Sequence, residues 1–308
     1  MQILCSLVVG MAASTLRPSR EQTENLLKSF RLAVAIFFGI VLFVRLPMLL
    51  FGRLPEATGL APEAISAMLF QSLFLCSWLL RRNKTDLLLC LACAALPVIA
   101  LTRGPMLGSL ALLVLTLAPL SLGRRVMFAV AALAVGWLVF NLPLVQQKMF
   151  WTGHGTIEDV TWENPNLRKH GRDLMLQRLW SGVTEKPWLG HGGNADATDL
   201  LDAGFEGVQP HNDWVRILFN YGIVGCALYV GAILLQIYHG WRWAGLAPPH
   251  TRVLLCAGLS AFVPFTVVMF TDNILIYAQF YGNLHFLLLG LAYGSLAAEQ
   301  EQEPLPET

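Results

Sequence analysis

The chain has 308 residues, of which 55% are hydrophobic and 13% charged, and its mean hydropathy is +0.56. This composition excludes an ordinary soluble globular domain, and the net charge of +1 argues against a nucleic-acid partner. The apolar stretches are continuous rather than alternating, which excludes a transmembrane β-barrel. We therefore predict an all-α, polytopic transmembrane helical bundle whose surroundings are a lipid bilayer.

Several apolar runs approach the roughly 20 residues that a membrane helix needs. They cover 31–51, 61–80, 86–101, 105–122, 126–144, 214–238, 253–270 and 274–297. A shorter apolar run, 1–16, has no basic residue before it and makes a poor signal peptide. We expect the chain to begin partway through a helix of a longer protein, or from an internal start.

The basic residues predict which side of the membrane each connection faces. Two crossings separate each basic cluster from the next, so all four clusters fall on one side, which the positive-inside rule makes cytoplasmic. The clusters are Arg17/Arg20/Lys28/Arg31, Arg81/Arg82/Lys84, Arg124/Arg125 and Arg242/Arg252. The predicted organisation is N-terminal membrane helices in 1–144, an extracytoplasmic loop in 145–210, C-terminal membrane helices in 211–298 and a cytoplasmic tail in 299–308.

The loop 145–210 is too long for a simple connector and carries four tryptophans, which disorder disfavours. Within it, 172–183 has the spacing of a short amphipathic helix. Arg172, Leu176, Leu179 and Val183 share one face, so we expect Arg172 to point toward the protein or the membrane surface. Arg178 projects from the opposite face, and we expect it to be solvated.

The stretch Trp188-Leu-Gly-His-Gly-Gly193 in the same loop is rich in glycine. It has the composition of a backbone anion-binding nest, although a tight turn is the simpler interpretation. Cys90-x-x-Cys93 has redox or zinc spacing, but it lies within an apolar run with no second pair or histidine beside it, and no cluster of histidines and carboxylates suggests a metal. We therefore expect no metal and no cofactor.

Arginines near the outer ends of the spans are candidate functional residues. Arg103 lies in Thr102-Arg103-Gly104, where two apolar runs meet on the outer side, and Arg45 and Arg216 lie within spans near their outer ends. An ionisable group at membrane depth is a functional candidate by default. The alternative is that each arginine extends its head group to the lipid–water boundary.

The segment His211-Asn212, nine residues, Gly222-x-x-Gly225 lies where the chain re-enters the bilayer. An imidazole exchanges protons near neutral pH, so His211 is a candidate base. The two glycines, about one helical turn apart, predict close packing of another helix. The plainer alternative is that Asn212 caps the following helix and His211 is only an interfacial residue.

Three motifs together resemble the O-antigen ligase and polymerase family of bacterial membrane proteins. They are Thr102-Arg103-Gly104, then Gly171-Arg172 followed by Lys186-Pro187-Trp188-Leu189-Gly190-x-Gly192, and His211-Asn212-x9-Gly222-x-x-Gly225. Their order, spacing and common side of the membrane make the combination more specific than any single motif. The resemblance runs from about residue 86 to 297. One departure is Leu176, where related sequences often have tryptophan.

The resemblance implies a glycosyltransferase outside the bacterial cytoplasmic membrane. The donor would be an undecaprenyl-diphosphate-linked glycan and the acceptor lipid A–core or another glycan. Arg103 and Arg172 would bind the diphosphate without a metal, because guanidinium groups form charged, bidentate hydrogen bonds. His211 would be the general base, and Asn212, Arg216 and Arg45 would contribute to substrate binding.

Three functions remain open from the sequence. A ligase, which the His-Asn-x9-Gly-x-x-Gly element favours slightly, would use lipid A–core as acceptor. A polymerase of the same family would use a second lipid-linked repeat. A polysaccharide transporter or flippase is less favoured, because the chain shows no paired repeat halves and the long outer loop would then lack a role.

Overall fold

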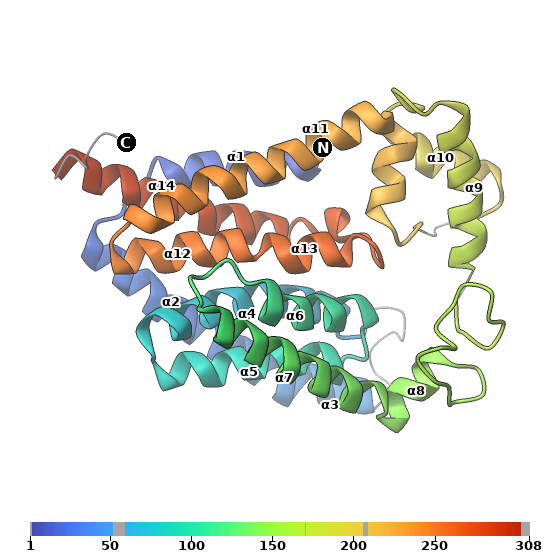
Figure 1. The fold of residues 1–308 in the computed structure, drawn as a ribbon, viewed down its shortest axis with the longest axis horizontal. Helices are drawn as coiled ribbons and strands as arrows, with labels where there is room; N and C mark the ends of the chain where they lie inside the picture. Colours follow the sequence, from blue (N-terminus) through green and yellow to red (C-terminus); the bar gives the residue numbers. More distant parts are fainter. Residues whose placement is uncertain (1, 52–58, 170, 206–208, 303–308) are drawn as a thin grey trace.

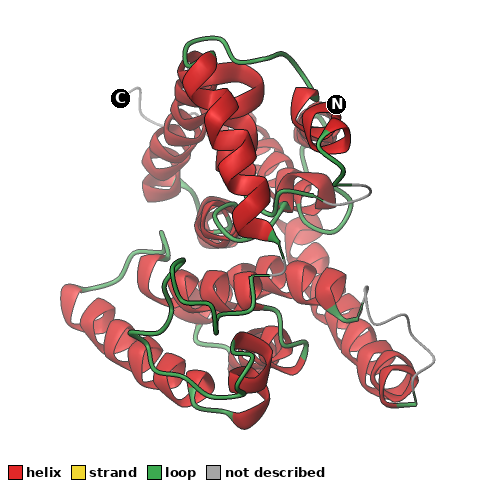
Figure 2. Ribbon diagram, turned by 90° about the vertical axis from the view of Figure 1, so that its right-hand side faces the viewer, coloured by secondary structure: helices red, strands yellow, loops and turns green. Residues whose placement is uncertain are grey.

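The protein is an all-α bundle, as predicted. The computed structural model describes residues 2–51, 59–169, 171–205 and 209–302, and their secondary structure is helices and loops, with a single β-bridge between Phe150 and Leu167 (Figures 1 and 2). The α-helices are α1 (Gln2–Ser14), α2 (Arg20–Ile40), α3 (Leu46–Leu50), α4 (Ala61–Arg81), α5 (Lys84–Ile99), α6 (Arg103–Leu115), α7 (Leu122–Phe140), α8 (Pro143–Met149), α9 (Arg172–Glu185), α10 (Ala195–Asp202), α11 (Asp213–Leu246), α12 (Pro249–Ser260), α13 (Phe262–Val268) and α14 (Gly282–Gln302). A π-helical turn, η1 (Val41–Arg45), joins α2 to α3, and a 3-10 turn, η2 (Ile274–Tyr277), precedes α14.

Five helical segments in the described residues are long and apolar enough to cross a membrane. They are Arg20–Met48, Ala61–Arg81, Leu122–Phe140, Asp213–Leu246 and Pro249–Val268. Most of Ala61–Arg81 and Pro249–Val268 is buried, so α4 and α12 form the middle of the bundle. Little of Leu122–Phe140 and Asp213–Leu246 is buried, which leaves α7 and α11 with large apolar surfaces for lipid.

Three of the predicted spans differ from the structure. The run 86–101 becomes the sixteen-residue α5, and 274–297 begins as a 3-10 turn, with α14 starting only at Gly282. The run 105–122 stops at Leu115, since Pro119 has no N–H with which to extend the helix. Arg125 Nη1 then donates to the freed carbonyl of Thr116 (3.1 Å).

The connections gather at two opposite ends of the bundle (Figure 1). One end, here called the basic end, carries 17–20, 81–84, 121–125 and 246–252, which hold much of the basic charge. Ion pairs of Arg81 with Glu24 and of Arg17 with Glu301 join its segments. The other end, here called the loop end, carries 101–102, 141–169, 171–205, 209–212 and 269–273, including α8, α9 and α10. Figure 2 looks onto the loop end.

Helix α11 is broken at Gly222, whose backbone (φ 64°, ψ −169°) is not helical. A Cβ at this position would lie 2.3 Å from the carbonyl carbon and oxygen of Trp188. The glycine therefore admits a loop rather than a helix. At Gly225 a Cβ would meet only the side chain of Tyr221. The prediction that the two glycines let another helix pack close is wrong.

We expect Gly222→Ala to destabilise the protein. This backbone region is almost exclusive to glycine and costs other residues about 1–3 kcal/mol, and the added methyl would also collide with the Trp188 carbonyl. The measurement is the melting temperature of the detergent-purified protein. Gly231→Ala, in the regular part of the same helix with no atom within 4 Å of the added Cβ, is the matched control and should not lower it. Equal melting temperatures for the two variants would contradict the role of the break.

Candidate active site

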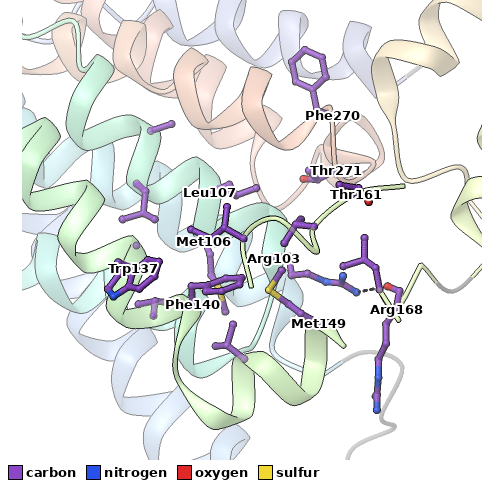
Figure 3. Close-up of a pocket in the computed structure, with 18 of the residues that line it drawn as sticks. Arg103, Met106, Leu107, Trp137, Phe140, Met149, Thr161, Arg168, Phe270 and Thr271 are labelled. Atoms are coloured by element: carbon purple, nitrogen blue, oxygen red, sulfur yellow. Dashed lines mark hydrogen bonds between the residues drawn. The ribbon is translucent and has the colours of Figure 1, made fainter. Parts of the chain in front are cut away.

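A cavity of about 1040 Å³ opens at the loop end, between α6, α7, α8 and the chain leading to α9 (Figure 3). One part is apolar and is lined by α6 and α7, including Leu107, Trp137 and Phe140. The other part is polar and strongly basic. It is lined by Arg103, Arg168, Lys169, Arg172 and His211. The cavity thus has an apolar wall on one side and several positively charged side chains on the other.

Arg103 is the first residue of α6, which places its side chain at the outer end of an apolar helix. The chain turns sharply just before it, with Leu101 in a left-handed conformation (φ 52°). The Arg103 guanidinium points into the polar part of the cavity, where Nη2 donates to the backbone carbonyl of Arg168 (3.1 Å, Figure 3). The charges of Arg172 and Arg168 are close enough to act on it. Repulsion between these cations makes the cavity receptive to an anion.

Arg172 is the first residue of α9, and Gly171 (φ 75°) turns the chain into that helix. Its Nη1 donates to the backbone carbonyl of Thr271 (3.3 Å), on the turn after α13. Burial lowers the pKa of Arg172, although the charge of Asp272 opposes that shift. A guanidinium remains protonated at neutral pH despite such a shift. The side chain therefore brings a fixed positive charge to the cavity.

His211 lines the same cavity as these arginines, and its backbone is left-handed (φ 50°). Its Nδ1 lies 3.0 Å from Oδ1 of Asp272. Two hydrogen bonds from the residues that follow it hold this geometry. The Asp213 amide donates to the Met269 carbonyl (2.8 Å), and Asn212 Nδ2 donates to the Phe270 carbonyl (3.2 Å). A non-glycine residue in this conformation is uncommon and is found at functional sites.

Asp272 determines which ring nitrogen of His211 carries the proton. Burial alone would raise the pKa of Asp272, but hydrogen bonds from His211 and the Asn273 amide, together with the charges of His211 and Arg172, lower it below its ordinary value. The carboxylate is therefore ionised at neutral pH and can only accept a hydrogen bond. Nδ1 of a neutral His211 must then carry the proton, which leaves Nε2 as the acceptor.

Comparison with known proteins supports the motifs from which the site was predicted. Residues 88–230, which contain Arg103, Arg172 and His211, match the family model described as O-antigen ligase. The resemblance to the O-antigen ligase family is confirmed. An O-antigen ligase of Pseudomonas aeruginosa is 35% identical over 60 residues, which is 20% of this chain and 15% of that protein. The alignment therefore spans far less than two thirds of that relative.

The structure does not bring the other candidate residues of this chain to the described cavity wall. Arg45 pairs with Glu63 (Nε–Oε1 2.6 Å), and Arg216 pairs with Asp196 (Nε–Oδ2 2.8 Å). Asn212 caps α11, because its side chain accepts from the Val215 amide (3.0 Å). The capping alternative for Asn212 is confirmed, whereas substrate binding by these three residues has no geometric support here.

The faces of α9 agree with the predicted amphipathic pattern. Leu179 and Val183 are buried, and Leu176 and Arg172 line the cavity. Arg178 is 52% exposed and forms a bidentate pair with Asp199 (2.9 and 2.7 Å). Its charge is thus satisfied away from the cavity.

The glycine-rich stretch does not form an anion nest. Its amides are used within the protein, since those of His191 and Gly192 donate to the carbonyls of Phe219 and Asn220 (2.9 and 2.8 Å). Such paired amides cannot cradle a ligand.

Sequence reasoning missed the partner of the histidine. Asp272 lies 61 residues after His211 in the chain, and the sequence motifs assign it no role. The one available signal was an acidic residue in a short turn on the same predicted side as His211. Arg168 and Lys169, for which the sequence motifs predict no role, also line the polar part of the cavity.

We expect Arg216→Ala to act on stability rather than on substrate binding. The substitution leaves the Asp196 carboxylate, whose side chain is 1% exposed, with Asn220 as its hydrogen-bond donor (2.7 Å). Breaking a buried ion pair in this way costs about 3 kcal/mol, so the melting temperature should fall. The exposed pair of Arg178 makes Arg178→Ala the control, with a melting temperature near that of the wild type. If Arg216→Ala kept the wild-type melting temperature but no longer bound the lipid-linked donor, Arg216 would be a substrate-binding residue after all.

Proposed function

We propose that the protein is a membrane glycosyltransferase that moves a glycan from undecaprenyl diphosphate to an acceptor on the outer side of the bacterial cytoplasmic membrane. The acceptor we favour is lipid A–core, as in an O-antigen ligase. The observation that carries the proposal is the meeting of Arg103, Arg172 and His211 at one cavity that also has an apolar wall. Membership of the matched segment in the O-antigen ligase family supports it.

The two parts of the cavity suit the two parts of a lipid-linked donor. The diphosphate would lie against Arg103 and Arg172, whose described hydrogen bonds go to backbone carbonyls rather than to carboxylates. The isoprenoid chain would lie along the apolar faces of α6 and α7. Since α7 is mostly unburied within the protein, this chain could continue directly into the bilayer.

His211 would remove a proton from the acceptor. As the acceptor hydroxyl oxygen forms a bond to the anomeric carbon, the bond from that carbon to the diphosphate oxygen breaks. Nε2 of His211 takes the hydroxyl proton, while Asp272 accepts the hydrogen bond from Nδ1–H and stabilises the resulting imidazolium. The diphosphate leaves with the electron pair, and the arginines stabilise its charge. Every proton and charge in this step has a group of the chain to receive it.

The arginine clamp predicts a specific pattern of losses. Arg103→Ala and Arg172→Ala should abolish transfer and weaken donor binding. Lysine should rescue either position poorly, because a point charge does not reproduce the planar fork. Arg178→Ala, which removes an arginine from the same helix as Arg172, should retain transfer. The measurement is transfer from purified lipid-linked donor, with donor binding assayed in parallel. Normal activity of Arg172→Ala with an inactive Arg178→Ala would contradict the clamp.

Substitutions of the histidine and of its carboxylate partner should lower kcat without weakening donor binding. His211→Ala should lower kcat by roughly 10²–10⁴-fold, the usual contribution of a general base, and leave donor affinity intact. Asp272→Asn should also lower kcat with little change in KM for the donor, because an amide at this position no longer enforces the Nδ1–H tautomer. Arg178→Ala, whose side chain pairs with Asp199 away from the cavity, is the control and should retain kcat. Unchanged kcat in His211→Ala would exclude its role as base.

The alternative within the family is a polymerase, which would transfer the growing glycan to a second lipid-linked repeat. The same cavity would serve both reactions, because donor and base are common to them. Supplying the purified protein with lipid A–core or with lipid-linked single repeats as the acceptor distinguishes the two. Transfer to lipid A–core alone supports the ligase, and products that lengthen by repeats support the polymerase.

A further inference from the structure

The loop 186–192, here called the clasp loop, is locked into the break of α11. Ile223 and Val224 donate their amides to the carbonyls of Pro187 and Trp188 (2.7 and 3.1 Å), and the two amides of His191 and Gly192 described above bond on the other side of the break. Backbone groups that the broken helix leaves without helical partners are thus paired with the clasp loop.

Two glycines make this contact possible. A Cβ on Gly222 would lie 2.3 Å from the Trp188 carbonyl, and one on Gly190 would lie 2.5 Å from the Asn220 carbonyl. The His191 ring adds a side-chain contact by stacking on Phe219 (4.5 Å between centroids). The clasp loop is therefore rigidly placed relative to α11.

This rigid loop directs its two largest apolar side chains outward. Trp188 is 67% exposed and Leu189 is 74% exposed. A soluble surface would hide such a pair, or break it up with charge. Here the pair is attached at the outer end of a membrane-spanning helix. On α11 the exposed apolar surface continues from the break into the span, through Ile223, Val224 and Leu228.

We propose that the clasp loop lies in the interfacial layer of the outer leaflet, with Trp188 and Leu189 in contact with lipid. The occupant follows from position, since Ile223 and Val224, which begin the exposed apolar surface of this candidate span, bond through their amides to the clasp loop. Tryptophan favours this layer, because its indole is apolar while its N–H bonds to water or head groups.

Contact of the clasp loop with lipid would fix the position of the outer loop relative to the membrane surface. Helix α9 ends at Glu185, immediately before the clasp loop, and packs on α11 through Leu179 and Phe219. Anchoring the clasp loop to the bilayer therefore holds α9, and with it Arg172, at a set height above the membrane. This inference concerns the surface of the protein and does not rest on the proposed reaction.

A nitroxide spin label tests the depth of the clasp loop directly. In a background that lacks the more accessible cysteines (Cys5→Ser, Cys226→Ala), we would label Leu189→Cys and, as the matched control, Leu174→Cys, an exposed leucine (57%) at the far end of α9. In Figure 1 α9 stands beyond the outer end of the bundle. Each variant is reconstituted in phosphatidylethanolamine–phosphatidylglycerol vesicles.

Collision rates with oxygen, which concentrates in lipid, and with a water-soluble nickel chelate then report depth. We expect a higher oxygen-to-nickel ratio at position 189 than at position 174. Equal ratios at the two positions would overturn the proposal, because the clasp loop would then lie in water. Exclusion of both reagents from position 189, with dipolar broadening between labels, would also overturn it, since a second copy of the chain would cover the surface.

Discussion

The break in α11 at Gly222 is the constraint on which the loop end depends. Beyond the break, the segment from Asp213 to Tyr221 leaves the direction of the long helix and packs under α9, where the Phe219 ring would lie 2.3 Å from a Cβ on Gly182. The same segment begins next to His211. One non-helical glycine thus sets the place of the histidine at its start and, through the packing of α9, that of Arg172.

Their hydrogen-bond and ion-pair partners separate the five arginines discussed above into two groups. Arg45, Arg178 and Arg216 each bond to a carboxylate, which neutralises most of the charge they could offer a ligand. Arg103 and Arg172 donate instead to backbone carbonyls, which orient a guanidinium without cancelling its charge. An anion can displace such a weak partner and gain a charged hydrogen bond, whereas it would have to break an ion pair at the other three.

Much of the fold and of the candidate site could be predicted from the sequence, for reasons that are local. Apolar run length predicts membrane helices, and the 3.6-residue period correctly predicted the inward face of α9, with Leu179 and Val183 buried. What failed depends on contacts distant in the chain. A pair of glycines about one turn apart is typical of close helix packing. Here Gly222 instead interrupts the helix, because the clasp loop, some 30 residues upstream, packs against it. The carboxylates that pair with Arg216 and His211 are likewise remote, so a local pattern could not tell a structural arginine from a free one.

The location of the cavity has an electrostatic consequence. Its cations lie at the end of apolar helices, next to a wall that faces hydrocarbon, so the effective dielectric constant there is lower than in bulk water. Attraction between a guanidinium and an anion is stronger in such a place, but so is the penalty for leaving the cation unpaired. Backbone carbonyls from Arg168 and Thr271 reduce that penalty, and Asp272 holds the His211 ring through Nδ1. A ligand that carries negative charge at the membrane surface and a hydrocarbon chain within it relieves both constraints at once.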